Sequence, residues 1–147
     1  MTLHIVKLCV GCDSVEDLAA WQKGRLADQR KRGVAKPQLA HNTRNTPKRG
    51  EEIAGEGSLY WVIKGVIRCR QRILGFRARK DREGKPYCDI LLDPKLVRTR
   101  PKPMRAFQGW RYFEAADAPP DLDAKDEART ASMPAAMVEE LRALGLV

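Results

Sequence analysis

The sequence lacks several features that would narrow its function at once. Its apolar runs are far shorter than the roughly 20 residues that cross a bilayer, which excludes a membrane-spanning helix. The N-terminal stretch has neither a basic start nor a long apolar segment, so we expect no signal peptide and a cytoplasmic protein. Histidine occurs only twice, and the nucleophile-elbow, zinc-protease and kinase motifs are missing. We therefore expect a non-catalytic module without a cofactor, with an enzyme as the alternative.

Cysteine is also scarce, and only Cys9 and Cys12 form a closely spaced pair among the four. The pair lies between a predicted strand and a predicted helix, which is where a redox dithiol would sit. However, no βαβ succession follows it, and a zinc site would need a second pair of ligands that the sequence does not provide. We expect reduced structural cysteines, with a redox pair or a zinc site as alternatives.

Positive charge is what the sequence has in excess. The formal net charge is +9, but residues 22–111 contain 24 Lys and Arg against 8 Asp and Glu. The rest of the chain carries a net charge of −7. A field of this kind attracts nucleic acid, an anionic membrane or an acidic protein. The predicted long helix has few large apolar residues, which disfavours a membrane, and a solvated surface without a partner is the remaining alternative.

The clearest pattern runs from Leu59 to Lys80, where residues alternate as in one β-strand with a single buried face. The odd positions, Trp61 among them, are predicted to lie in the core. After Ile73 the apolar residues move to even positions, which predicts a β-bulge near residues 72–75. The opposite face then carries a row of cations about 6.6 Å apart. These are Lys64, Arg68, Arg70 and Arg72.

The other segments predict an α+β fold: a mostly antiparallel bent sheet or partial barrel, with a long N-terminal helix and a short C-terminal helix. We expect one domain over residues 1–147. Further strands are predicted at 3–8, 87–92, 96–100 and 107–113, helices at 14–32 and 132–145, and an acidic connector at 114–131.

Residues 33–58 form a long basic loop in this scheme. Structureless loops of that length are uncommon in compact domains. We therefore expect the loop to contain a short strand near Gln38–Arg44 and a helical turn near Glu51–Ala54.

The candidate binding residues are cations with a few aromatic neighbours. Arginine binds phosphate through paired N–H groups, and aromatic rings stack on bases. Tyr60 shares the predicted cationic face and is, with Trp110, the candidate for stacking. The full nucleic-acid or anion-binding set is His41, Arg44, Lys48, Arg49, Tyr60, Lys64, Arg68, Arg70, Arg72, Trp110 and Arg111.

These residues favour a non-catalytic basic module that binds nucleic acid, RNA rather than DNA, through a cationic face of the sheet. The hypothesis requires Arg68, Arg70 and Arg72 to project together into solvent. One alternative is an enzyme or binding protein for an anionic small molecule, with its site at His41, Arg44, Lys48 and Arg49. The other is a protein-interaction module.

Three stretches, residues 3–11, 41–65 and 107–112, together resemble a bacterial family described only as a domain of unknown function. The resemblance covers nearly the whole chain and implies a single-domain protein without an assigned activity. The segment Tyr60-Trp61-Val62-Ile63-Lys64 is also similar to the opening strand of EVE domains, which belong with the PUA-like and ASCH folds. That similarity implies a small β-barrel over residues 59–113, with Tyr60, Trp61 and Lys64 near a pocket for RNA or a modified base.

Overall fold

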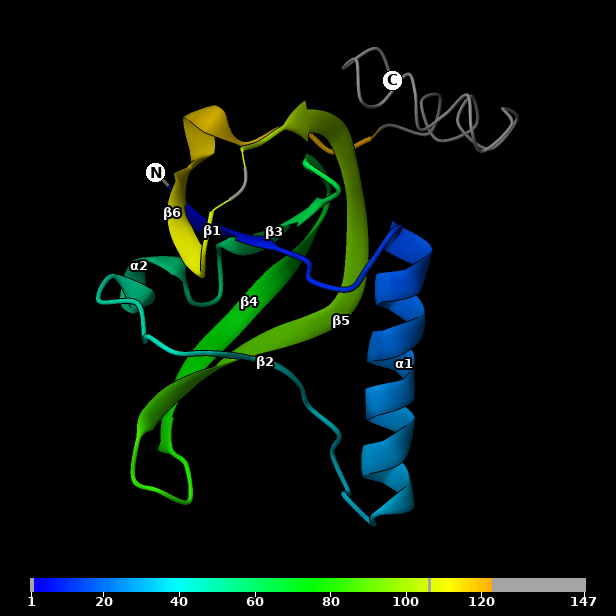
Figure 1. Cartoon of the computed structure of the whole chain (residues 1–147), viewed down its shortest axis with the longest axis vertical. Coiled ribbons are helices and arrows are strands. Elements are labelled where there is room, and N and C mark those ends of the chain that lie inside the picture. Colours follow the sequence, from blue (N-terminus) through cyan, green and yellow to red (C-terminus); the bar gives the residue numbers. More distant parts are fainter. Residues whose placement is uncertain (1, 106, 123–147) are drawn as a thin grey trace.

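The computed structural model describes residues 2–105 and 107–122. They form one strongly bent mixed sheet of six strands in the order β2-β5-β4-β3-β1-β6, with a long helix beside it (Figure 1). The elements are β1 (Leu3–Leu8), α1 (Val15–Lys31), β2 (Leu39–Thr43), α2 (Gly50–Ile53), β3 (Ser58–Ile63), β4 (Val66–Lys80), β5 (Pro86–Pro103), β6 (Trp110–Glu114) and a 3-10 turn, η1 (Ala115–Asp117).

The predicted α+β class is confirmed, because among the strands of the described residues only β1 and β3 pair in parallel and the other neighbouring strands are antiparallel. The short strand and the helical turn expected within residues 33–58 are also confirmed, as β2 and α2. The C-terminal helix predicted at 132–145 lies outside the described residues.

Helix α1 begins and ends where the sequence predicts. Ser14 is extended and its hydroxyl accepts a hydrogen bond from the Asp17 N–H at 3.1 Å, which satisfies one of the free donors of the first turn. Acidic residues occupy the first turn and basic residues the last, as the helix dipole favours. Val15 and Leu18 anchor the helix in the core.

The segment from Leu59 to Lys80 is not one strand, which corrects the prediction. A turn at Lys64 and Gly65, with φ of +50° and +77°, folds it into the β3–β4 hairpin. A two-residue turn pairs Ile63 with Val66 and so reverses the odd–even alternation. A β-bulge at Arg68 restores it, because Ile67 pairs with Val62 but Cys69 pairs with Trp61. The two shifts cancel, and the sequence therefore imitates a single strand.

Strand β5 is also longer than predicted. It continues for 18 residues through Pro94, where the sequence indicated a break before a separate strand. The pairing with β4 skips residues 93–95, since Leu92 pairs with Ile73 and Leu96 with Gln71. Proline fits at such an irregularity because no ladder hydrogen bond from its nitrogen is needed there. A separate shift in the same ladder confirms the bulge predicted near residues 72–75: Ile73 pairs with Leu92 and Gly75 with Leu91, which leaves Leu74 as the extra residue in β4.

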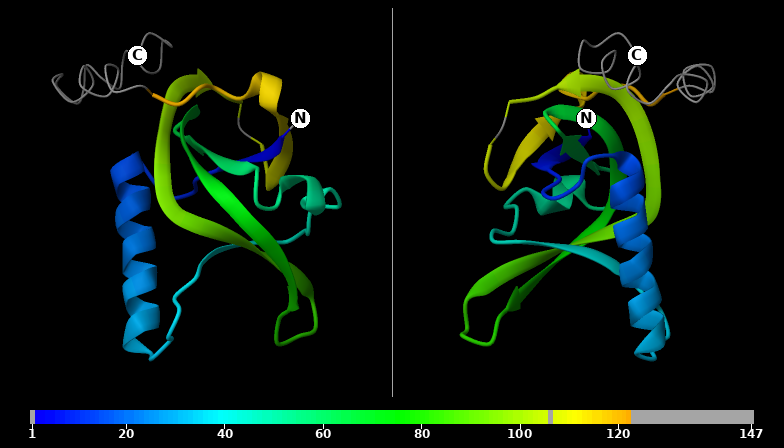
Figure 2. Two further views of the ribbon diagram at one scale, coloured as in Figure 1. Left: turned by 180° about the vertical axis from the view of Figure 1, so that it is seen from behind. Right: turned by 45° about the vertical axis from the view of Figure 1, so that its right-hand side comes forward.

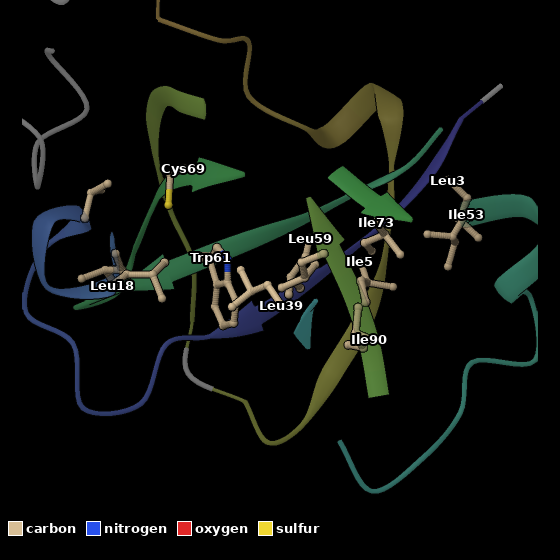
Figure 3. Packing of buried hydrophobic residues seen from close by; sticks show 13 residues of the cluster. Leu3, Ile5, Leu18, Leu39, Ile53, Leu59, Trp61, Cys69, Ile73 and Ile90 are labelled. Atoms are coloured by element: carbon tan, nitrogen blue, oxygen red, sulfur yellow. The ribbon is translucent and has the colours of Figure 1, made fainter. Parts of the chain in front are cut away.

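Both faces of the sheet carry a hydrophobic core, and this explains why every residue of β3 is buried. The larger cluster, shown in Figure 3, combines α1 with one face and contains Ile5, Leu59 and Trp61. The smaller cluster on the other face contains Tyr60 and Phe113. Burial of each large side chain contributes about 1.5–3 kcal/mol, so both faces contribute to stability.

A buried polar network connects α1 to the sheet. The side-chain amides of Gln22 and Gln71 exchange two hydrogen bonds of 2.8 Å. The Trp61 indole N–H donates to Gln71 Oε1 at 2.9 Å, and Gln71 Nε2 donates to the Asp93 carbonyl at 3.1 Å. This network fixes the helix at one position on the sheet.

Candidate functional site

The row of cations predicted on β4 does not exist as an open surface. Arg68 lies at the bulge and is only 5% exposed. Arg70 donates from Nε and Nη2 to the two carboxylate oxygens of Asp121, both at 2.7 Å. Arg72 is exposed, and its Nε donates to the Gly55 carbonyl at 2.7 Å. The three guanidinium groups therefore do not project together into solvent, and this part of the prediction is wrong.

The aromatic residues of β3 have structural positions. Trp61 is 1% exposed, which confirms its assignment to the core. Tyr60 does share a face with Arg70, as predicted, but its ring is buried in edge contact with His4 and Phe113. Burial contradicts the stacking role for Tyr60, because a base needs an open ring face.

Two other predicted site residues are held at the surface. Lys64 lies in the β3–β4 turn with its ammonium 3.7 Å from Asp13. Arg111 is exposed, and its guanidinium lies over the Phe107 ring, 4.9 Å from the centroid. By register Arg111 shares the sheet face of Arg70, but it lies on the edge strand β6, with β3 and β1 between the two residues.

The loop after β2 is attached to β6 by aromatic and charged contacts. The Trp110 indole N–H donates to the Asn45 carbonyl at 3.1 Å, and the Arg49 backbone N–H donates to the Tyr112 hydroxyl at 3.0 Å. Arg49 also pairs with Glu52 through two hydrogen bonds of 2.7 and 2.9 Å. These contacts occupy Arg49 and Trp110 in positioning the loop, while the neighbouring Lys48 is exposed.

The anion site predicted around His41 does not assemble. His41 faces α1 and Trp61, whereas the Arg44 guanidinium lies by the β4–β5 hairpin, 3.4 Å from the Pro86 carbonyl. Arg49 points to Glu52, as described above. The four residues of that hypothesis therefore do not enclose one pocket.

The exposed cations gather instead on two elements that project from the sheet. We call these the basic fork, defined as residues 23–36 and residues 77–89. The end of α1 and the tip of the β4–β5 hairpin extend to the same end of the molecule, and β2 crosses between them (Figures 1 and 2). Residues 23–36 contain six Lys and Arg against one Asp. The exposed cations of the fork are Lys23, Arg25, Arg30, Arg32, Lys31, Lys36, Arg77, Arg79, Lys80, Arg82 and Lys85.

One buried carboxylate fixes the base of the hairpin. Asp89 is 3% exposed and accepts hydrogen bonds from Arg77 at 2.9 Å and Arg79 at 3.2 Å. Two cations share this one anion, so the β4–β5 hairpin keeps a net positive charge. A depression of about 640 Å³ lies beside it, between Arg44 on the β2 side and Lys80, Arg82 and Tyr87 on the hairpin. The sequence contains these charges, but only the fold brings α1, β2 and the hairpin together.

A second cavity, of about 620 Å³, lies among β1, α1, β2 and β3. We call it the β1–α1 cavity, and its lining includes Lys7, Cys9, Trp21, His41 and Trp61. His41 meets Trp61 edge to face, with ring centroids 5.0 Å apart and an interplanar angle of 89°. Asn42 lines this cavity and the depression of the fork, so the two are neighbours across β2.

Burial controls the protonation of the groups in the β1–α1 cavity. It lowers the pKa of His41 to about 4, assisted by the charges of Lys7 and Arg25, so that His41 is neutral at pH 7. Burial also lowers the pKa of Lys7. The pKa of the Cys9 thiol is raised by burial and by its hydrogen bond with Cys12, which keeps the thiol protonated.

The alternatives for the cysteine pair gain no support from this geometry. A redox nucleophile needs a lowered thiol pKa, and Cys9 has the opposite shift. No group of three or more His, Cys, Asp or Glu suited to a metal ion occurs within residues 2–105 and 107–122. Over the same ranges, no helix is long and apolar enough to cross a membrane.

The fold is thus an α+β domain with a basic fork at one end and a partly open cavity beside it. A family model described as a protein of unknown function, DUF1489, matches residues 5–147, and the chain belongs to this family. No curated protein matches the chain, and no solved structure matches it. The resemblance to a domain of unknown function is confirmed, and the similarity of residues 60–64 to EVE domains stays a prediction.

Proposed function

We propose that the protein is a non-catalytic nucleic-acid-binding module, with RNA favoured, and that the basic fork makes the phosphate contacts. The observation that carries this proposal is the gathering of exposed cations on two elements that project at the same end of the molecule (Figure 2). RNA is favoured because neither the sequence nor the fold of residues 2–105 and 107–122 offers a recognition-helix motif for the DNA major groove.

The physical basis is the release of counterions. Each phosphate that a Lys or Arg neutralises frees condensed cations, so that log K for a single strand falls with log salt by about 0.7 per contact. The acids of the hairpin, Asp81 and Glu83, reduce its charge but do not cancel it. Long exposed side chains suit contacts of this kind, which depend on charge more than on exact geometry.

The test is fluorescence anisotropy with labelled single-stranded RNA and DNA oligomers at several salt concentrations. The hairpin variant Lys80→Gln/Arg82→Gln/Lys85→Gln is expected to bind about tenfold more weakly near physiological salt, with the salt slope reduced by about 2. The matched control Arg72→Gln/Arg105→Gln/Arg111→Gln removes the same charge from outside the fork. We expect it to lose less than half as much binding free energy.

Two results would overturn the proposal. The first is no binding by the unmodified protein even at low salt. The second is an equal loss in the hairpin variant and in its control, which would mean that net charge, and not the fork, determines the affinity.

A further inference from the structure

The β1–α1 cavity contains a positive charge that has no counter-ion in contact within the described part of the chain. Lys7 lies half-buried on β1 and lines the cavity. Among the described residues no carboxylate lies within 4 Å of its ammonium, and burial is the cause that lowers its pKa. Partial burial of an unpaired ammonium is unfavourable, and a bound anion relieves that cost.

The other charged groups around the cavity favour one negative charge over two. Asp17 also lines it, and its carboxylate accepts the Asp13 N–H at 3.0 Å. The positive charge of Arg25, on α1, helps to lower the pKa of His41. The Arg25 guanidinium lies over the Trp21 ring, 4.7 Å from the centroid. Burial raises the pKa of the Cys9 thiol, so that this group adds no charge at neutral pH. A dianion would meet the Asp17 carboxylate with too few cations to balance it.

The walls of the cavity suit a flat ring. The His41 ring forms one wall and is held edge to face by the buried Trp61, and Trp21 lines the side that belongs to α1. Trp21 is 47% exposed although it is a large apolar residue, which leaves part of its ring available. The volume falls within the range of small-molecule sites, which are mostly apolar with a few polar groups.

We propose that the β1–α1 cavity binds a small planar organic monoanion, of the class of aromatic or heteroaromatic carboxylates. The carboxylate lies against the Lys7 ammonium, and the ring lies between His41 and Trp21. This site is separate from the phosphate contacts of the basic fork, and the proposal does not depend on nucleic-acid binding.

The test uses the full chain, labelled with ¹⁵N, titrated with benzoate and with indole-3-carboxylate in NMR spectra. We expect saturable shifts of the backbone amides from Lys7 to Gly11 and of the Trp21 and Trp61 indole N–H signals. Benzamide is nearly identical in shape to benzoate but lacks its charge, and it is expected to bind at least tenfold more weakly. Cyclohexanecarboxylate keeps the charge without the flat ring, and it is expected to bind more weakly as well.

Variants separate Lys7 from general electrostatics. Lys7→Met is expected to lose at least tenfold in benzoate affinity, and the exposed control Lys95→Met is expected to lose none. Bound benzoate should also raise the pKa of His41, because its charge offsets those of Lys7 and Arg25. This pKa is followed by the imidazole proton shifts.

Three outcomes would overturn the proposal. They are benzamide binding as tightly as benzoate, a loss in Lys95→Met equal to that in Lys7→Met, and no saturable shift with either carboxylate at millimolar concentration. The comparison of benzoate with benzamide uses the unmodified protein, so it decides the matter even if Lys7→Met does not fold.

Discussion

Replacing Gln71 by leucine tests what holds α1 on the sheet. Gln71 is fully buried and takes part in four hydrogen bonds, with the Gln22 amide twice, the Trp61 indole and the Asp93 carbonyl. Leucine is of similar size, so the change removes the polar partners and leaves little cavity. Gln22 is only 4% exposed, so water can hardly replace the hydrogen-bond partner that its amide loses.

The magnitude follows from the groups left unpaired. Each buried donor or acceptor without a partner costs about 1–3 kcal/mol, and small relaxations recover part of this sum. We expect Gln71→Leu to lower the free energy of unfolding by about 3–5 kcal/mol, a large fraction of the usual 5–15 kcal/mol. Urea unfolding followed by circular dichroism measures it, with a fall in Tm of roughly 10 °C for a domain of this size.

The double variant Gln22→Leu/Gln71→Leu is the control for this reasoning. Replacing both partners by apolar groups avoids the unpaired amide on α1. The loss of unfolding free energy in the double variant is therefore expected to be at least 1 kcal/mol smaller than the sum of the two single losses. A loss below about 1 kcal/mol for Gln71→Leu, or simple additivity in the double variant, would refute the idea that the network attaches the helix.

Two further predictions concern pH and backbone strain. Burial lowers the pKa of His41 to about 4 and also lowers the pKa of His4, so the unfolded chain binds protons more readily and stability falls as the pH drops from about 6.5 towards 4. In urea titrations at several pH values, His41→Phe should remove most of this fall, and an unchanged pH dependence would contradict the assignment. Gly65→Ala is expected to cost about 1–2 kcal/mol, because Gly65 has a φ of +77° and the added methyl meets no neighbour within 4 Å. Gly24→Ala, within α1, is the matched control and should stabilise by about 0.5–1 kcal/mol; a loss there would show that the measured cost of Gly65→Ala is not specific to positive φ.

Local signals in the sequence were sufficient for several elements. The Ser14 cap and the charges at the helix ends predicted α1 almost to the residue. The rarity of long structureless loops predicted β2 and α2 within residues 33–58. These predictions hold because capping, charge and loop length act over a few neighbouring residues.

The alternation from Leu59 to Lys80 misled the prediction for a physical reason. A two-residue turn and a single bulge each shift the alternation by one position, and together they restore it. Alternation in the sequence indicates which face of the sheet a residue occupies. It does not reveal a turn and a bulge whose shifts of the alternation cancel. The predicted binding face on β4 was therefore placed on residues that the fold buries (Arg68), pairs with an acid (Arg70) or bonds to a backbone carbonyl (Arg72).

The sequence by itself determined the strong net charge, the position of the long helix and the mixed class of the fold, since these depend on composition and on nearby residues. Only the tertiary structure decided which cations reach solvent. Arg68 is buried because cores lie on both faces of the sheet, and Arg70 is neutralised by Asp121, which is 51 residues away in sequence. The basic fork and the β1–α1 cavity likewise arise where segments far apart in sequence meet, and such meetings depend on the packing of the whole chain.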